Sequence, residues 1–330
     1  MRRKVFQIDP TETLAPYTYE RAAIAAAGGE LVVGDCLTPE DLIAQAGDAE
    51  ILLLSWKKII TPAVMEALPH ARLIVRWGVG YDMVDVAAAT AHGIAVANAP
   101  TYAVDDVAEH TLGLLLCCVR QLAWFHQRMR QGEWNSPLGH AIHRMRGRTL
   151  GLVGVGRIGA AVAWRARGLG LRVVAYDPGV RAESLQALDI EPCSFDEVLG
   201  QADYLSVHVP LSAATHHLID ASCFAKMRPG AIFLNTSRGP VVDEGALVEA
   251  LASGQLGGAG LDVFEQEPLA QESPLRNLEQ VVLTPHTAAY SVESWQALRE
   301  EVCATVQSWF TTGWAPNIVN PQVRPTLRSQ

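Results

Sequence analysis

Short apolar runs alternate with amphipathic stretches along most of the chain. In the first hundred residues we predict strands at residues 5–8, 31–33, 51–54, 73–76 and 94–97. Helical patterns, for example residues 40–46 and 61–67, lie between these strands, and each begins at a Thr-Pro pair that is typical of a helix N-terminus. Because uniformly apolar strands separated by helices are typical of a parallel sheet covered on both faces, the pattern predicts an α/β domain.

A second series of the same kind follows a long predicted helix over residues 104–131 and a polar segment at 132–147. Its strands are expected at residues 150–153, 172–176, 204–209, 231–235, 258–263 and 281–283, and its helices at 158–169, 195–199, 222–227, 243–252 and 292–310. Six strands in strand–helix alternation make up a complete dinucleotide-binding sheet. We therefore expect two doubly wound parallel-sheet α/β domains.

Composition and charge exclude several classes of protein. The chain has 26 Lys and Arg against 35 Asp and Glu, a formal net charge of −9, which is a poor match for a nucleic acid. Its apolar runs fall short of the ~18–20 residues that a membrane span needs, and none follows the basic N-terminus as in a signal peptide. The six cysteines form no C-x-x-C motif and no His/Cys cluster, which indicates reduced thiols, a cytoplasmic location and no bound metal.

A glycine loop follows the first strand of the second series. Gly154, Gly156 and Gly159 match G-x-G-x-x-G, with an apolar strand before the loop and an alanine-rich helix after it. The first glycine allows the tight turn, the second lets the backbone approach a pyrophosphate, and the third lets the helix pack on the strand. The phosphates would meet the N–H groups at the helix start, so the predicted cofactor site includes Arg157 and Ile158.

Asp177 ends the next strand, 18 residues after Gly159 (159 to 177). A carboxylate at this position accepts hydrogen bonds from the adenosine ribose and repels a 2′-phosphate, which favours NAD over NADP. Pro178 follows it instead of an arginine, although Arg181 keeps NADP open as an alternative. Asp177-Pro178 is also compatible with a plain turn after a strand.

Three chemically active residues follow later strands of the same series: Arg238, Glu267 and His286. Ligands of open parallel sheets bind outside the carboxyl ends of the strands, so these side chains can converge on one point. Taken singly, each has a simpler explanation. Arg238 could cap a strand, Glu267 could belong to a turn with Pro268, and His286 could be an ordinary loop histidine.

The combination resembles the D-isomer-specific 2-hydroxyacid dehydrogenase family, in particular its C-terminal-binding-protein-like and phosphoglycerate-dehydrogenase-like branch. The similarity extends from about residue 73 to 320 and is carried, besides these motifs, by residues 120–130, 163–170, 176–178, 216–219 and 288–291. The resemblance implies an NAD-dependent enzyme that reversibly reduces a small 2-oxo acid to a D-2-hydroxy acid.

The resemblance also implies a role for each residue. Arg238 would bind the substrate carboxylate and polarise the carbonyl, His286 would be the general acid and base, and Glu267 would hold its imidazole. Val79 and Gly80 would offer backbone N–H groups to the carboxylate, although they could form a simple turn before a helix. Further cofactor contacts are expected at His208, Pro210, Thr215, Thr236, Ser237 and Asp262.

The family's architecture predicts where the domains divide. We expect a flavodoxin-like substrate domain from residues 1–101 plus 290–330, an NAD-binding Rossmann domain at 102–289, and a cleft between them. Family members dimerise across the cofactor domain, so we expect a homodimer with Trp124, Phe125 and Trp134 at its interface.

Single residues distinguish this chain from enzymes with related functions on the same architecture. Formate dehydrogenases place Gln beside the histidine, where this chain has Glu267, and phosphite dehydrogenases place Lys where this chain has Val79. An NAD(H)-sensing corepressor with weak dehydrogenase activity is the remaining alternative. Ala289 stands where the mammalian C-terminal-binding proteins have Trp before the tyrosine, so substrate size cannot be inferred from that branch.

Overall fold

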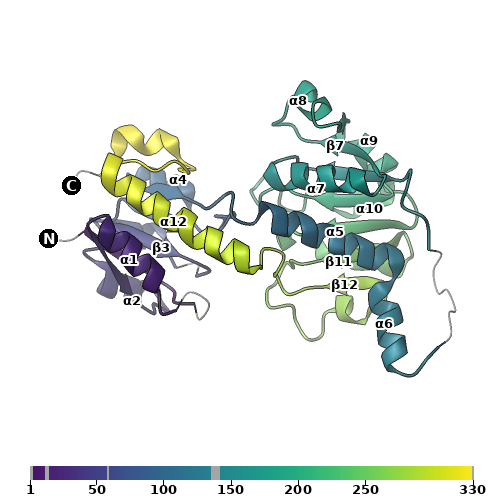
Figure 1. Cartoon of the computed structure of the whole chain (residues 1–330), viewed down its shortest axis with the longest axis horizontal. Coiled ribbons are helices and arrows are strands. Elements are labelled where there is room, and N and C mark those ends of the chain that lie inside the picture. Colours follow the sequence, from purple (N-terminus) through teal and green to yellow (C-terminus); the bar gives the residue numbers. More distant parts are fainter. Residues whose placement is uncertain (1–2, 12–14, 58, 135–141, 329–330) are drawn as a thin grey trace. The chain divides into compact units, whose positions relative to one another are not determined.

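The computed structural model describes residues 3–11, 15–57, 59–134 and 142–328. The chain divides into two compact units, the first made of Met1–Ala103 and Ser291–Gln330 and the second of Val104–Tyr290. Each unit contains one parallel sheet with helices on both faces (Figure 1), which confirms the predicted fold class. Part of the predicted polar segment, residues 135–141, lies outside the described residues.

Unit 1 holds a five-stranded sheet in the order β2-β1-β3-β4-β5. The strands are β1 Arg3–Gln7, β2 Gly29–Val33, β3 Ile51–Leu54, β4 Leu73–Arg76 and β5 Ala95–Ala97. The helices are α1 Thr18–Ala26, α2 Pro39–Ala46, α3 Pro62–Ala67, α4 Val86–Ala91 and α12 Val292–Thr312, with the 3-10 helix η3 Pro321–Thr326. The 2-1-3-4-5 strand order is that of flavodoxin-like domains.

Alternation along the strands of unit 1 produces two cores. Val5 and Leu53 pack under α1 and α12, whereas Phe6 and Leu52, their neighbours in sequence, pack under α2, α3 and α4. Successive side chains of a strand point to opposite faces, so a fully apolar strand such as β3 is buried on both sides. Trp309 of α12 is fully buried, and the C-terminal return is therefore part of this unit's core.

Unit 2 holds a seven-stranded sheet in the order β12-β11-β10-β9-β6-β7-β8. The strands are β6 Thr149–Val153, β7 Arg172–Tyr176, β8 Glu191–Pro192, β9 Tyr204–Val207, β10 Ala231–Asn235, β11 Leu256–Leu261 and β12 Val281–Leu283. The order reverses beside β6, as in the Rossmann fold. The sequence predicted six strands; the seventh, β8, is a two-residue strand at the sheet edge, where a proline is tolerated.

Helices cover both faces of the second sheet. They are α5 Val104–Arg120, α6 Leu122–Arg130, α7 Arg157–Gly168, α8 Ala182–Gln186, α9 Phe195–Gln201, α10 Ala221–Lys226 and α11 Glu244–Ala252, with the 3-10 helices η1 Gly239–Val241 and η2 Pro274–Asn277. Residues of α5, α7 and α8 share one apolar core with the sheet, and residues of α9, α10 and α11 share the other. None of the helices in the described part of the chain is long and apolar enough to cross a membrane.

The prediction of a single helix over residues 104–131 is wrong. Gln121 adopts a left-handed conformation (φ 52°), and the chain there forms two helices, α5 and α6, in different directions (Figure 1). Neither a proline nor a glycine marks the break in the sequence. α5 packs into the unit with Leu114 and Leu115, whereas α6, all of whose residues the structure describes, has no buried residue.

Candidate active site

The glycine loop joins β6 to α7 at the carboxyl edge of the unit 2 sheet. Gly154 has φ +94°, and a Cβ there would lie 2.8 Å from the His208 carbonyl oxygen; a Cβ on Gly159 would lie 2.4 Å from the Gly154 oxygen. Gly156 is the N-cap residue of α7, without a side-chain cap, and a Cβ there would have no atom of the described residues within 4 Å. The helix start therefore has open space and N–H groups for a pyrophosphate, so the loop fits a dinucleotide.

Asp177 lies directly beside this loop, at the end of β7. Its Oδ2 accepts a hydrogen bond from the Val155 N–H at 2.7 Å, and its Oδ1 accepts one from the Gly179 N–H at 2.8 Å. A carboxylate oxygen has room for a second donor, so a ribose hydroxyl can still bind there. Arg181 is the exposed N-cap residue of α8.

His208 follows β9 and stands behind the glycine loop. Its Nε2 lies 2.9 Å from the Ser206 hydroxyl, and burial of the ring lowers the pKa of His208 to about 4. The imidazole is therefore neutral near pH 7 and has the apolar character expected of a wall for an adenine ring. Farther along the loop, the Thr215 hydroxyl donates to the Pro210 carbonyl at 2.6 Å and so closes the turn between them.

Arg238 is held by a turn that Asn235 organises at the end of β10. The Asn235 side chain accepts from the Ser237 N–H at 3.0 Å and the Ser237 hydroxyl at 2.8 Å, and donates to the Arg238 carbonyl at 2.9 Å. The Arg238 guanidinium donates to the Ser237 carbonyl at 2.8 Å. Asn235 was not among the predicted site residues, although an asparagine before a polar loop is a known signal for such a turn.

Gly239 brings the Arg238 loop against the loop after β11. A Cβ on Gly239 would lie 1.9 Å from the carbonyl carbon and oxygen of Phe264. Backbone atoms cannot yield as a flexible side chain can, so only glycine fits. This close approach brings the Arg238 loop and the loop of Glu267 together.

Glu267 and His286 form a hydrogen-bonded pair. The His286 Nδ1 and Glu267 Oε2 atoms are 2.7 Å apart, and Glu267 Oε1 accepts from the Phe264 N–H at 3.0 Å. Burial alone would raise the pKa of Glu267, but the His286 hydrogen bond and charge, the Phe264 N–H and the Arg238 charge together hold it below its ordinary value. Glu267 is therefore a carboxylate near pH 7, and both Arg238 and His286 lie within electrostatic reach of it.

The His286 backbone is fixed by Asp262, which is 1% exposed. His286 has φ +54°, and its N–H donates to the Asp262 carbonyl at 2.8 Å. The Asp262 carboxylate accepts from the N–H groups of Thr287 and Ala288, both at 2.9 Å, and from the Thr284 hydroxyl at 2.6 Å. Asp262 thus holds the segment that carries His286; the predicted contact with the cofactor remains a prediction.

The remaining predicted site residues occupy two places. Thr236 is buried at the end of β10, with its hydroxyl 2.8 Å from that of Thr111 in α5. Val79 and Gly80 belong to unit 1, in the loop after β4, where the Asn98 amide donates to the Val79 carbonyl at 2.6 Å. Their predicted contact with a substrate carboxylate remains a prediction.

Replacing Gly239 with alanine should destabilise the protein by about 1–3 kcal/mol, because the new Cβ must displace the Phe264 backbone. Gly113→Ala is the matched control: it lies exposed in α5, has no described atom within 4 Å of the place its Cβ would take, and should gain about 0.5–1 kcal/mol from helix propensity. Urea unfolding measures both changes. A Gly239→Ala protein as stable as the wild type would contradict the close approach.

Comparison with known proteins assigns the chain to a family. The family model of the D-isomer specific 2-hydroxyacid dehydrogenase NAD binding domain matches residues 112–288. The chain is 39% identical to a glyoxylate reductase of Korarchaeum cryptofilum, covering 86% of each chain. It is 40% identical to a D-3-phosphoglycerate dehydrogenase of Mycobacterium tuberculosis over 94% of this chain, but spans only 58% of that longer protein.

Solved structures agree with this assignment. The structure of a glyoxylate reductase from Paecilomyes thermophila matches with a TM-score of 0.89 and 29% identity, covering 97% of this chain and 99% of that one. The D-lactate dehydrogenase from Aquifex aeolicus, complexed with NAD and lactic acid, matches with a TM-score of 0.83 and 29% identity, covering 96% and 99%. With the predicted motifs present in the predicted fold, the chain belongs to the D-isomer-specific 2-hydroxyacid dehydrogenase family.

Proposed function

We propose that this NAD-dependent 2-hydroxyacid dehydrogenase reversibly reduces a small 2-oxo acid to a D-2-hydroxy acid, with Arg238, Glu267 and His286 as its catalytic residues. The observation that carries the proposal is the 2.7 Å contact between His286 Nδ1 and Glu267 Oε2, beside the charge of Arg238. The names of the relatives support the substrate class, since they include glyoxylate reductases, D-3-phosphoglycerate dehydrogenases and D-lactate dehydrogenases.

The pair with Glu267 determines which atom of His286 exchanges the proton. Glu267 is ionised near pH 7 and can only accept, so Nδ1 carries the hydrogen and Nε2 is the atom available to the substrate oxygen. When bound, NADH would supply the hydride, that is a proton with two electrons, that C2 of the oxo acid requires. The proton that completes the hydroxyl group comes from Nε2 of the His286 imidazolium, and in the reverse direction the neutral Nε2 takes it back.

Arg238 would bind the substrate carboxylate. A planar guanidinium donates two parallel hydrogen bonds to a carboxylate, which fixes the orientation of the acid as well as its position. The bond from Arg238 to the Ser237 carbonyl and the Asn235 turn restrict the movement of this side chain before substrate arrives. Its positive charge would also stabilise the developing charge on the C2 oxygen.

The cofactor would lie along the loops of unit 2. The N–H groups of residues 156–159, at the start of α7, would bind the pyrophosphate, and Asp177 would bind the adenosine ribose. His208, Pro210 and Thr215 would line the adenine side, while Thr236, Ser237 and Asp262 would approach the nicotinamide side.

An NADH-oxidation screen over glyoxylate, hydroxypyruvate, pyruvate, phenylpyruvate and branched 2-oxo acids tests the function. We expect turnover of at least one small 2-oxo acid. His286→Asn should lower kcat about 10²–10⁴-fold, because it removes the acid and base, while NADH affinity stays near normal. Asparagine is chosen because it tolerates the left-handed backbone at φ +54° better than alanine.

Two results would contradict this function. Undiminished turnover in His286→Asn would remove the histidine from the mechanism. Trace turnover of every acid, together with tight binding of NADH by fluorescence titration, would instead favour an NAD(H)-sensing binding protein.

Asp177→Asn should raise the ratio of kcat/KM for NADP⁺ to that for NAD⁺ by about tenfold, which corresponds to about 1.4 kcal/mol. The amide removes the negative charge that repels a 2′-phosphate, yet its oxygen can still accept from the Val155 N–H. Steady-state kinetics with both cofactors measure the ratio, and the melting temperature controls for damage to the glycine loop. An unchanged ratio would mean that another residue sets the cofactor preference.

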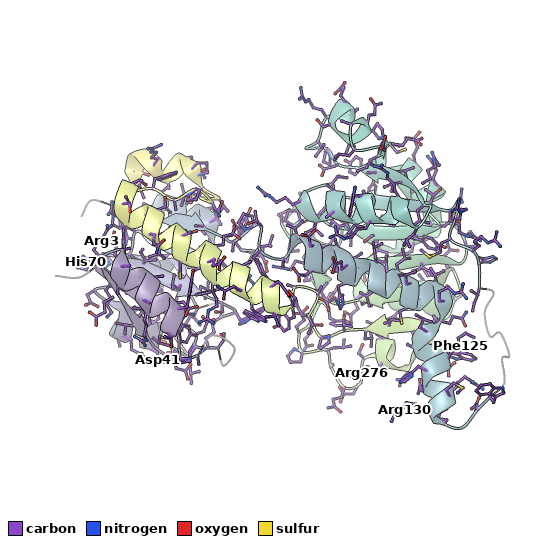
Figure 2. All side chains as sticks on the ribbon, viewed as in Figure 1. Arg3, Asp41, His70, Phe125, Arg130 and Arg276 are labelled. Carbon is purple, nitrogen blue, oxygen red and sulfur yellow. The ribbon has the colours of Figure 1, made fainter. Side chains whose placement is uncertain are left out.

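The surface of α6 supports a homodimer through unit 2. Three apolar side chains on this helix or just after it are exposed: Leu122 54%, Met129 50% and Trp134 84%. Figure 2 shows Phe125 and Arg130 on α6, projecting beyond the edge of the sheet. A second copy of the chain would remove this apolar surface from water.

Sedimentation velocity at micromolar concentration should find a dimer for the wild type and a monomer for Leu122→Glu, because a buried unpaired carboxylate is costly. Leu188→Glu is the matched control, since Leu188 is similarly exposed at 46% but lies after α8. A monomeric wild type, or a dimer that survives Leu122→Glu, would contradict this interface.

A further inference from the structure

Two adjacent residues of α5 reach two different loops of the candidate site. His110 Nε2 lies 2.9 Å from the Thr284 hydroxyl, in the loop of His286. The next residue, Thr111, lies 2.8 Å from the Thr236 hydroxyl, in the loop of Arg238. Successive residues of a helix point about 100° apart, so one turn of α5 can contact both loops at once. Apart from the predicted cofactor contact of Thr236, none of these four residues has a part in the proposed chemistry.

The number of hydrogens available shows that Nε2 of His110 is a hydrogen-bond donor. The Thr284 hydroxyl has one proton, which it donates to Asp262 Oδ1 at 2.6 Å. The contact between Thr284 Oγ1 and His110 Nε2 therefore requires a hydrogen on Nε2, which donates to Oγ1. The same Nε2 is 3.5 Å from Asp262 Oδ1, so the N–H also faces the buried carboxylate.

This chain of hydrogen bonds ends at the backbone of His286. Asp262 accepts from Thr284, Thr287 and Ala288, and its carbonyl accepts from the His286 N–H. The left-handed conformation of His286 costs free energy and persists only because its surroundings fix it. A change in the orientation of Asp262 would therefore move the imidazole that Glu267 holds.

We propose that His110 and Thr284 are positioning residues: the His110 Nε2–H orients the Thr284 hydroxyl toward Asp262, and Asp262 in turn fixes the backbone of His286. This inference rests on the proposed role of His286 as acid and base. Neither His110 nor Thr284 exchanges a proton with the substrate. They keep Nε2 of His286 in the position from which proton transfer is fast, and small displacements of such a group are costly for kcat.

Pairs of isosteric variants test the donor and the hydroxyl separately. His110→Leu and Thr284→Val keep the volume but remove the polar group, and each should lower kcat about 10- to 100-fold with a change of less than about twofold in the Kd of NADH. His110→Gln places an amide N–H near the Nε2 position, and Thr284→Ser keeps the hydroxyl, so both should recover most of kcat. If only the volume of these side chains mattered, His110→Gln and Thr284→Ser would not recover kcat in this way.

Hydrogen exchange followed by mass spectrometry gives a readout that does not depend on activity. In His110→Leu, the N–H groups of His286, Thr287 and Ala288 should exchange faster, because all three donate to Asp262. Thr111→Val is the matched control on the same turn of α5. It should leave that segment unchanged and speed exchange around Ser237 instead, because Thr111 contacts Thr236.

The outcomes separate this inference from the proposed function. If His110→Leu retains wild-type kcat, or if His110→Gln loses as much as His110→Leu, the positioning role is wrong. If the wild type turns over none of the 2-oxo acids, the proposed function fails, and the exchange experiment alone decides whether His110 fixes the His286 segment. Unchanged exchange at residues 286–288 in His110→Leu would then overturn the inference.

Discussion

The carboxylate of Asp262 accepts three hydrogen bonds at a position almost completely excluded from water. Removing a negatively charged group from water costs several kcal/mol unless donors surround it, so the folded chain must supply these donors. They come from Thr284, Thr287 and Ala288, and a segment that satisfies Asp262 has little freedom left. The uncommon backbone conformation of His286 follows from this requirement, because the residues on both sides are already committed.

The topology of unit 2 explains why distant residues form one site. β10, β11 and β12 are neighbours in the sheet and run parallel, so the loops that follow them leave the same edge. Arg238, Glu267 and His286 lie on these three consecutive loops. Gly239 lets the first loop touch the second, and the bond between His286 and Glu267 joins the second to the third.

The sequence was sufficient for most of the strands and for the loops of the candidate site, because both are local patterns. Apolar runs such as Ile51–Leu54 and Val281–Leu283 are strands with the predicted bounds. The break at Gln121 was missed, since a left-handed glutamine has no sequence signal comparable to glycine or proline. The two-residue strand β8 was missed because its pairing depends on the position of β7.

The role of the positioning residues could not be predicted from the sequence either, and the reason is a different one. His110 and Thr111 lie in an ordinary amphipathic helix, and their partners are more than a hundred residues away in sequence. Only the packing of α5 on the sheet determines which loops they reach. For Asp262 the family resemblance implied a contact with the cofactor, but not that both carboxylate oxygens accept hydrogen bonds from the loop of His286.

The C-terminal return of unit 1 has a consequence for how the chain folds during synthesis. Trp309 is fully buried in the core of the N-terminal strands, and the Arg328 guanidinium binds the carbonyls of Met65 at 2.8 Å and His92 at 2.7 Å. Unit 2, by contrast, is one continuous stretch that ends at Tyr290. A ribosome therefore releases every residue of the second unit before the first can close its core. The N-terminal strands emerge earliest and mature last, so the nascent chain must keep them from aggregating throughout the synthesis of unit 2.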